Sequence, residues 1–247
     1  MMFSHPAHEL PVLGLIQHCR PDLLFLTRVD SAGEQEREEF ARQGLDRLDL
    51  LENATFFGIP EADVHRWLLQ GDASGVLELR ARILAWLTQH RPDAVFGDAF
   101  ELTNVVHDLA RATLDSALRA YTLTHPCRNF ELPLACRTAP EPWSFHFQEF
   151  PGETAHAFLL DEAQMRTKKQ VADWMGTRFK EAAVGAQVFP LEREVYREVP
   201  ARRDYTVPPA GLMLHYDEWG KAQVARGKYK EPILFASHFV PLVRQLP

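Results

Sequence analysis

Short apolar runs alternate with longer segments of helical periodicity through the first half of this 247-residue chain. The clearest runs lie at residues 23–27, 54–58 and 94–97, and the segments between them repeat apolar residues at helical spacing. An apolar run, a helix and another apolar run are typical of parallel strands joined by crossover helices. The pattern therefore predicts an α/β fold, a three-layer α/β/α, Rossmann-like arrangement around a mostly parallel sheet.

The second half of the chain has a different texture. Prolines interrupt it repeatedly, and residues 143–148 alternate apolar and polar side chains, which is typical of antiparallel or edge strands. Residues 161–179 have helical periodicity. Neither an internal repeat nor a linker stands out. We therefore expect one domain over residues 1–247, with a core in 1–121 and a C-terminal elaboration of strands and helices in 122–247.

Aromatic residues gather near the C-terminus, at Tyr216, Trp219, Tyr229 and Phe235. Such a group is most often part of a hydrophobic core, but a lid over a binding site or a dimer surface has the same composition. These alternatives stay open at the level of the sequence. The oligomeric state, including a homo-oligomer, stays open with them.

Charge and cysteine content exclude several classes of protein. Lys and Arg total 27 against 34 Asp and Glu, a net charge of −7 without a basic block, so no nucleic-acid ligand is expected. Three cysteines without paired spacing argue against a disulfide framework or a thiolate zinc site and favour a reducing compartment. No segment approaches the roughly 18 apolar residues of a membrane span, and no signal peptide is evident. We expect a cytoplasmic protein.

Two histidines lie three positions apart near the N-terminus, in the segment His5-Pro6-Ala7-His8-Glu9. A loop there can present both rings to one point, but a catalytic zinc site takes three protein ligands and leaves a fourth position for water. His107, at the start of a helix predicted over residues 104–121, is the best candidate for the third ligand. The alternative is a chance pair among 11 histidines together with a structural histidine on an apolar helix.

Polar residues directly follow the third apolar run. We expect residues 94–97 to deliver Asp98 and Glu101 into a loop that precedes the helix. Ligand sites of α/β sheets gather outside the carboxyl ends of the strands. Acidic residues at this place are therefore candidates for catalysis.

Two segments of the chain resemble motifs of one family. His5-Pro6-Ala7-His8-Glu9, followed by the run at residues 23–27, resembles the His-Pro-Asp-Asp-Glu segment of the LmbE-like zinc deacetylases, which include the N-acetylglucosaminyl-phosphatidylinositol de-N-acetylases. Residues 92–98, followed by Asn104-Val105-Val106-His107, resemble that family's strand, aspartate-containing loop and His-Pro-Asp-His helix start. The resemblance covers residues 3–120 and implies the same fold and a zinc-dependent deacetylase activity.

The resemblance assigns roles residue by residue. The family's metal ligands fall on His5, His8 and His107, with zinc as the implied metal and another divalent transition metal as the alternative. Its oxyanion-stabilising histidine falls on Asn104, which still donates a hydrogen bond. Its general base falls on Ala7, and an alanine methyl cannot transfer a proton.

The altered first motif leaves the proton transfer without a carrier. General acid–base help is typically worth about 10²–10⁴-fold in rate, so another residue has to replace the missing base. Asp98 and Glu101, in the loop expected after residues 94–97, are the candidates within reach.

These roles imply a metal-dependent hydrolase that removes an acetyl or related N-acyl group from an amino sugar or glycoconjugate by attack of metal-bound hydroxide. Three neutral imidazoles leave the charge of the ion uncompensated, which favours ionisation of its water. Because Ala7 removes the base, the alternative is a catalytically degenerate relative that binds a sugar or metabolite or serves as a scaffold. A metal-free α/β protein with coincidental histidines is the third alternative.

Overall fold

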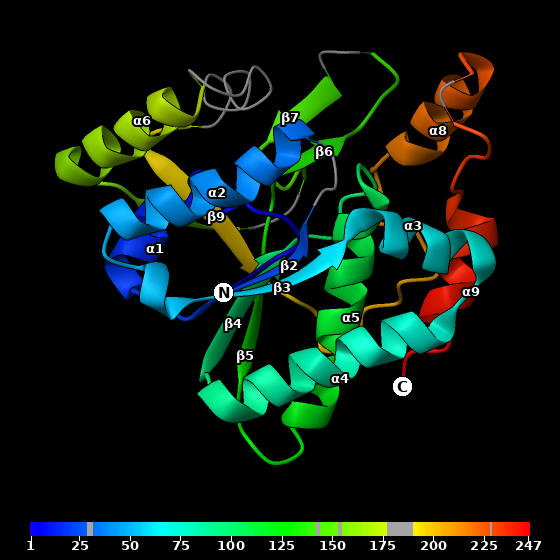
Figure 1. The fold of residues 1–247 in the computed structure, drawn as a ribbon, viewed down its shortest axis with the longest axis horizontal. Helices are drawn as coiled ribbons and strands as arrows, with labels where there is room; N and C mark the ends of the chain where they lie inside the picture. The colour runs from blue at the N-terminus through cyan, green and yellow to red at the C-terminus, as the bar shows by residue number, and fades with distance from the viewer. Residues whose placement is uncertain (29–31, 142–143, 153–154, 177–189, 228) are drawn as a thin grey trace.

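Within the described residues, seven strands form one sheet: β1 (Met2–Phe3), β2 (Leu23–Arg28), β3 (Ala54–Pro60), β4 (Ala94–Asp98), β5 (Arg128–Leu132), β8 (His156–Leu159) and β9 (Arg193–Glu198). The structure is a computed structural model (Figure 1). This structure describes the whole chain except residues 29–31, 142–143, 153–154, 177–189 and 228. For residues 32–36 and 175–176 it describes the backbone alone.

The strands stand in the order β3-β2-β1-β4-β5-β9-β8. The five strands from β1 to β5 run parallel, whereas β9 is antiparallel to both of its neighbours, β5 and β8. A separate antiparallel pair joins β6 (Ala135–Arg137) to β7 (Phe145–Phe147). The predicted mostly parallel sheet is confirmed.

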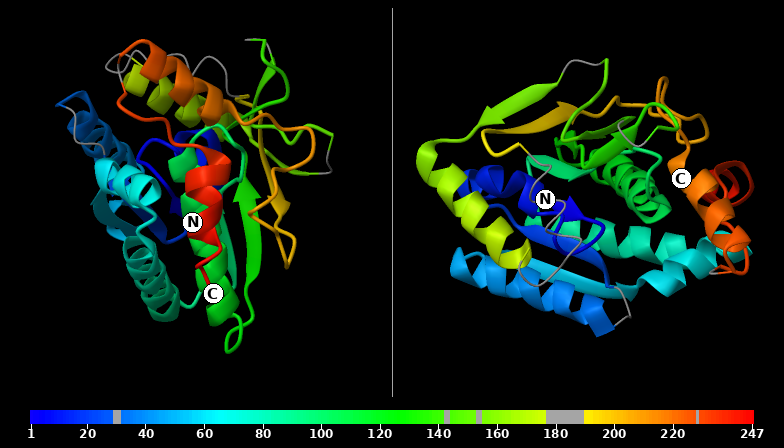
Figure 2. Two further views of the ribbon diagram at one scale, coloured as in Figure 1. Left: turned by 90° about the vertical axis from the view of Figure 1, so that its right-hand side faces the viewer. Right: turned by 90° about the horizontal axis from the view of Figure 1, so that it is seen from above.

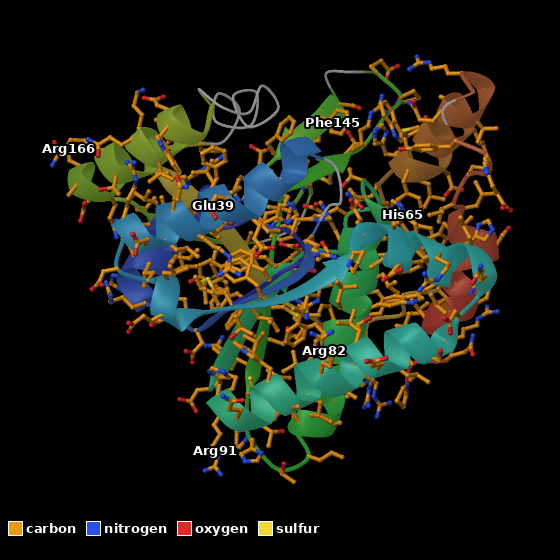
Figure 3. All side chains as sticks on the ribbon, viewed as in Figure 1. Glu39, His65, Arg82, Arg91, Phe145 and Arg166 are labelled. Carbon is orange, nitrogen blue, oxygen red and sulfur yellow. The ribbon has the colours of Figure 1, made fainter. Side chains whose placement is uncertain are left out.

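Helices cover both faces of this sheet. They are α1 (Leu13–Cys19), α2 (Ala32–Arg47), α3 (Glu61–Gln70), α4 (Ala73–His90), α5 (Val105–Tyr121), α6 (Glu162–Gly176), α8 (His215–Ala225) and α9 (Val240–Val243), with short helical turns η1 (Leu10–Val12), η2 (Leu51–Asn53) and η4 (Phe235–Phe239). Figures 1 and 2 show α6 beside α1, and α8 and α9 near α3. Exposed charged residues such as Glu39, Arg91 and Arg166 lie on the outer surface (Figure 3).

Alternation along the strands divides the core into two layers. Leu24 and Leu26 of β2 belong to the hydrophobic cluster formed with α3, α4 and α5, whereas Leu23 and Phe25 belong to the cluster formed with α1 and α2. Successive side chains of a strand point to opposite faces, so a central strand that is apolar throughout needs helices on both sides. The predicted three-layer α/β/α arrangement is therefore confirmed.

The three apolar runs are β2, β3 and β4, but two boundaries differ from the prediction. Strand β3 continues to Pro60, and β4 includes Asp98, whose backbone pairs with Leu132 of β5. The expectation that Asp98 lies in the following loop is therefore wrong, because ladder pairing with β5 extends the strand by one residue.

The expected elements of the second half are present where they are described. The alternating segment contains β7, although Trp143 lies outside the described residues, and the helix expected over residues 161–179 is α6, which ends at Gly176. Residues 177–179 also lie outside the described part. No helix within that part is both long and apolar enough to cross a lipid bilayer.

The strand order creates a switch point between β1 and β4. From β1 the chain proceeds outward through β2 to β3 and then returns to the other side of β1 to build β4 and β5. Open α/β sheets bind ligands in the crevice outside the carboxyl ends of strands at such a point. His5 follows β1 by two residues and Asp98 ends β4, so both lie at this crevice.

Candidate metal centre

His5 is held in one orientation by Thr27 of the neighbouring strand. The Thr27 Oγ1 atom lies 2.8 Å from His5 Nδ1 and 2.7 Å from the carbonyl oxygen of Ser4. The hydroxyl has one hydrogen and the carbonyl can only accept, so Thr27 donates to Ser4 and accepts from His5 Nδ1. In the neutral ring this leaves a lone pair on Nε2.

His8 is oriented by Asp98 in the same way. Oδ2 of Asp98 lies 2.9 Å from His8 Nδ1 and accepts hydrogen bonds from the backbone nitrogen of Ser4 at 2.7 Å and from its hydroxyl at 2.5 Å. Burial by itself raises the pKa of Asp98, but the neighbouring His8 and these hydrogen bonds lower it to about 2. An ionised Asp98 only accepts, so His8 Nδ1 carries a proton, and Nε2 is the nitrogen of this ring that can offer a lone pair to a metal ion.

His107 comes from the first turn of α5. Asn104 caps this helix, because its Oδ1 accepts a hydrogen bond of 2.8 Å from the backbone nitrogen of Val106. The Nδ1 atom of His107 is buried, and no described residue pairs with it. Burial, and to a smaller extent the neighbouring His8, lowers the pKa of His107 to about 3.

The three imidazoles meet at one point. Ring centroids are 5.0 Å apart for His5 and His8, 4.9 Å for His5 and His107, and 4.5 Å for His8 and His107. One nitrogen from each ring lies within 4.8 Å of the other two. The structure thus brings together all three residues that the sequence predicts as ligands, two from the segment after β1 and one from α5.

The chemistry of this donor set fits a divalent transition ion. Burial, with the neighbouring His107 and His8, holds the pKa of His5 well below its usual range, so its ring is neutral. Its Nε2 lone pair then lies 3.4 Å from Oε1 of Glu61. A cation bound beside these two acceptors would offset their repulsion, and neutral imidazole is a preferred ligand of zinc and its neighbours in the periodic table.

Glu101 is tied to the backbone instead of facing the imidazoles. Its two carboxylate oxygens accept hydrogen bonds from the backbone nitrogens of Leu134 at 2.6 Å and Ala135 at 3.2 Å. Burial raises the pKa of Glu101 well above its usual range in spite of these hydrogen bonds. Its carboxylate therefore fixes the segment after β5.

Sequence reasoning missed two acidic residues that lie beside the cluster. Glu61 is the first residue of α3, directly after β3, and the rule that singled out Asp98 also applies to this strand end. Glu9 adjoins His8, and its buried Oε2 has no partner among the described residues. Burial raises the pKa of Glu9 to about 7.

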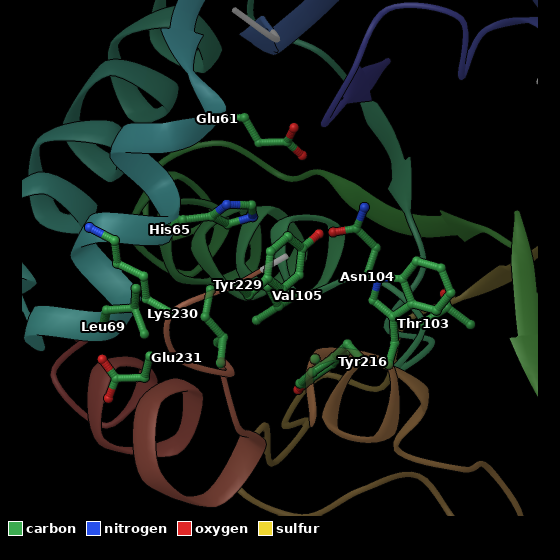
Figure 4. A pocket seen from close by; sticks show the side chains of 13 residues that line it. Glu61, His65, Leu69, Thr103, Asn104, Val105, Tyr216, Tyr229, Lys230 and Glu231 are labelled. Carbon is green, nitrogen blue, oxygen red and sulfur yellow. The ribbon is translucent and has the colours of Figure 1, made fainter. Parts of the chain in front are cut away.

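A cavity of about 650 Å³ adjoins the cluster through Glu61 and Asn104. Figure 4 shows Glu61 and His65 of α3 pointing toward Asn104 across this space. Its other walls come from the chain near Thr103 and from the C-terminal part of the chain. These lining residues are Leu69, Thr103, Val105, Tyr216, Trp219, Gly220, Tyr229, Lys230, Glu231 and Ile233.

The C-terminal aromatic residues separate into two groups. Phe235 is buried and packs against Phe100 and Phe239 in the core. Tyr216 and Trp219 of α8 and Tyr229 line the cavity instead. One half of the surface of Trp219 and of Tyr229 is exposed. The aromatic group is thus partly core and partly cavity wall.

Comparisons by sequence give no match, either to a protein-family model or to a curated protein. Comparison with solved structures gives matches. A deacetylase from the biosynthesis pathway of teicoplanin, solved in complex with teicoplanin, aligns with a TM-score of 0.51 and 12% identity over 82% of this chain and 98% of that chain. A triple mutant of a deacetylase of the same pathway aligns with a TM-score of 0.49 and 14% identity over 80% of this chain and 95% of that one. The predicted resemblance to LmbE-like deacetylases is confirmed at the level of the fold.

Proposed function

We propose that the protein is a metal-dependent hydrolase that removes an acetyl or related N-acyl group from an amino sugar or glycoconjugate. The observation that carries the proposal is the convergence of three imidazoles, His5, His8 and His107, at the switch point of the sheet. The shared fold with a deacetylase supports it. So does the cavity beside the cluster, which has room for a small-molecule substrate.

His5, His8 and His107 would hold the ion, with zinc implied by the family resemblance. A divalent ion at such a site polarises a carbonyl group and lowers the pKa of water. The chain contributes orientation: Thr27 fixes the His5 ring, and Asp98 fixes the His8 ring through Nδ1. Hydrogen bonds of this kind hold a ligand in one tautomer and raise its basicity.

Asn104 would stabilise the oxyanion that develops on the acyl oxygen. Its Oδ1 is committed to the cap of α5, and this fixes the direction of the Nδ2 amide group. Asn104 also lines the cavity (Figure 4). A donor aimed in advance at a developing oxyanion contributes about 10²–10³-fold in rate.

The cavity walls support a substrate with a sugar part. Tyr216, Trp219 and Tyr229 offer flat apolar faces with polar edges, which suit the apolar faces and hydroxyl groups of pyranose rings. The deacetylase with the same fold was crystallised with teicoplanin, and this supports a glycoconjugate as the substrate class.

The prediction that Asp98 or Glu101 carries the proton stays untested. Their hydrogen bonds argue for other roles, because Oδ2 of Asp98 accepts from Ser4 and His8, and Glu101 holds two backbone nitrogens. We assign Asp98 to positioning His8 and Glu101 to fixing the segment after β5.

Metal analysis tests the proposal most directly. We expect about one zinc per chain in the purified protein and the loss of that zinc in His107→Ala, with His156→Ala, an exposed histidine of β8, as the matched control. Hydrolysis of N-acetyl sugars should follow the zinc content. Absence of zinc from the wild type, even after zinc is supplied, would refute the proposal.

A catalytically degenerate relative that binds a sugar or metabolite is the second candidate, favoured by Ala7. This residue occupies the place of the base and adopts a φ of 80°, in the left-handed region that aspartate enters more readily than alanine. If the protein has lost the chemistry, the wild type binds zinc without hydrolysis and Ala7→Asp gains activity. Hydrolysis by the wild type in the same assay of N-acetyl sugars excludes this candidate.

A further inference from the structure

A carboxylate from a different part of the chain, that of Glu61, lies beside the three imidazoles. Glu61 opens α3, and its Oε1 lies 3.4 Å from Nε2 of His5. Its side chain is 18% exposed, compared with 4% for His5, so Glu61 lies on the cavity side of that contact. It also lines the cavity with Asn104.

The register of β2 and β3 explains how Glu61 reaches this place. Phe25 pairs with Phe56, but Thr27 pairs with Ile59, so β3 contains one extra residue opposite β2. Gly58 in this bulge has a φ of 63°, a conformation that favours glycine. A bulge changes the face to which the following residues point, and bulges recur beside active sites for that reason.

The same register carries Glu61 toward His5. Thr27 contacts His5 through Nδ1, and Ile59, its partner on β3, precedes Glu61 by two residues. The two nitrogens of the His5 ring therefore contact neighbouring parts of the sheet. Thr27 of β2 contacts Nδ1, and Glu61, directly after β3, brings a carboxylate to Nε2.

Other carboxylates near the cluster do not have this combination. Asp98 and Glu101 do not line the cavity. Glu9 is 4% exposed and does not line the cavity. Among the described acidic residues near the imidazoles, Glu61 alone both touches a predicted ligand and faces the substrate space.

We propose that Glu61 is the catalytic residue that accepts the proton of the attacking water, in place of the carboxylate missing at Ala7. This inference rests on the proposed function. The water oxygen bonds to the acyl carbon while one water proton passes to Glu61. That proton then passes to the amide nitrogen as the carbon–nitrogen bond breaks. The products are the carboxylic acid and the free amine, Glu61 is ionised again, and no further reactant is needed.

The test compares Glu61→Gln with Asp63→Asn. Both residues are acids in the first turn of α3, so both substitutions remove one favourable charge from the same helix end. Asp63 pairs with Arg66 at 2.7 Å and does not line the cavity. Thermal unfolding checks that both variants are folded. The probes are zinc and acetohydroxamate, a zinc-binding amide analogue whose hydroxyl proton is given up to a nearby carboxylate.

We expect both variants to bind one zinc per chain, with an affinity within about threefold of the wild type. Binding of acetohydroxamate to the zinc-loaded protein, measured by calorimetry, should weaken at least tenfold in Glu61→Gln only. Hydrolysis in that variant should fall about 10²–10⁴-fold, the usual contribution of general acid–base help.

The other outcomes overturn the inference in distinguishable ways. Wild-type hydroxamate affinity in Glu61→Gln would show that Glu61 takes no proton, while the metal site stands. Loss of zinc from Glu61→Gln would make Glu61 a ligand instead of a proton acceptor. A wild type that binds no zinc would remove the proposed function and this inference together.

Discussion

Single side chains decide the orientation of two of the three imidazoles in the candidate metal centre, those of His5 and His8. Thr27 and Asp98 each accept the Nδ1 proton of one histidine, so Nε2 is the nitrogen that His5 and His8 can offer to a metal ion. A ring that is free to turn loses part of its binding energy to the entropy of being ordered. These two hydrogen bonds prepare the site in advance.

Asp98→Asn should weaken zinc binding by about 10–100-fold, the usual effect of removing such a carboxylate. The amide keeps the shape of the side chain but accepts the His8 proton without a negative charge. Competition with a chelator of known affinity measures the change. Asp93→Asn, at an exposed residue directly before the same strand, is the control and should bind zinc as the wild type does. Equal affinities in all three proteins would contradict the role assigned to Asp98.

The residues of the site were only partly predictable. His5, His8 and His107 were identified from two short motifs, because spacing and family resemblance preserve the order of ligands along the chain. Glu61 was not, since its contact with His5 depends on the pairing of β2 with β3 and on the bulge at Gly58. The position of Glu61 directly after a strand was a signal that could have marked it as a candidate, but its contact with His5 has no local signal in the sequence.

The start of α5 is the element that ties the site to the fold. Asp108, in the first turn of this helix, accepts hydrogen bonds from the backbone nitrogens of Glu101 and Leu102 at 3.0 Å and 3.2 Å. It therefore closes the loop between β4 and α5 and holds the turn that carries His107. Asp108 is fully buried, and burial raises its pKa from 3.8 to about 8.

This pKa predicts a pH dependence of stability. Between pH 4 and pH 8 the unfolded chain ionises Asp108 while the folded chain keeps it protonated, so the free energy of unfolding falls as pH rises. Asp108→Asn removes this term, whose limit is about 1.4 kcal/mol per pH unit. Urea unfolding at pH 5 and pH 8 should show a smaller loss in the variant than in the wild type or in Asp63→Asn. Parallel pH profiles would contradict the prediction.

On the scale of the whole molecule, the second half of the chain joins the first through β5 and β9. Glu131 of β5 is fully buried and accepts a hydrogen bond of 2.5 Å from Arg197 of β9. It also pairs with Arg203 at 2.7 Å, and these Arg residues hold the pKa of Glu131 below its usual range against the effect of burial. Because β9 and β8 extend the same sheet, we propose that residues 1–247 form one domain.

Glu131→Gln should destabilise the protein by about 3–5 kcal/mol, since two guanidinium groups lose a buried carboxylate. Glu198 of β9, next to the Arg197 that pairs with Glu131, offers a matched control. Glu198→Gln breaks an exposed ion pair with Arg128 and should change stability by less than about 1 kcal/mol. Chemical unfolding measures both, and a single domain predicts one transition in each. Two transitions, or equal effects of the two substitutions, would contradict the whole-molecule interpretation.

The amino-acid sequence by itself determined the layers of the fold and the identity of the three imidazoles. Apolar runs such as residues 23–27 need helices on both faces, and this requirement is local to each element. The tertiary structure decided which side chains meet. It places Asp98 against His8, ties Glu101 to the backbone after β5, and brings Glu61 to His5. Strand order and register set these contacts, and both depend on the packing of the entire sheet.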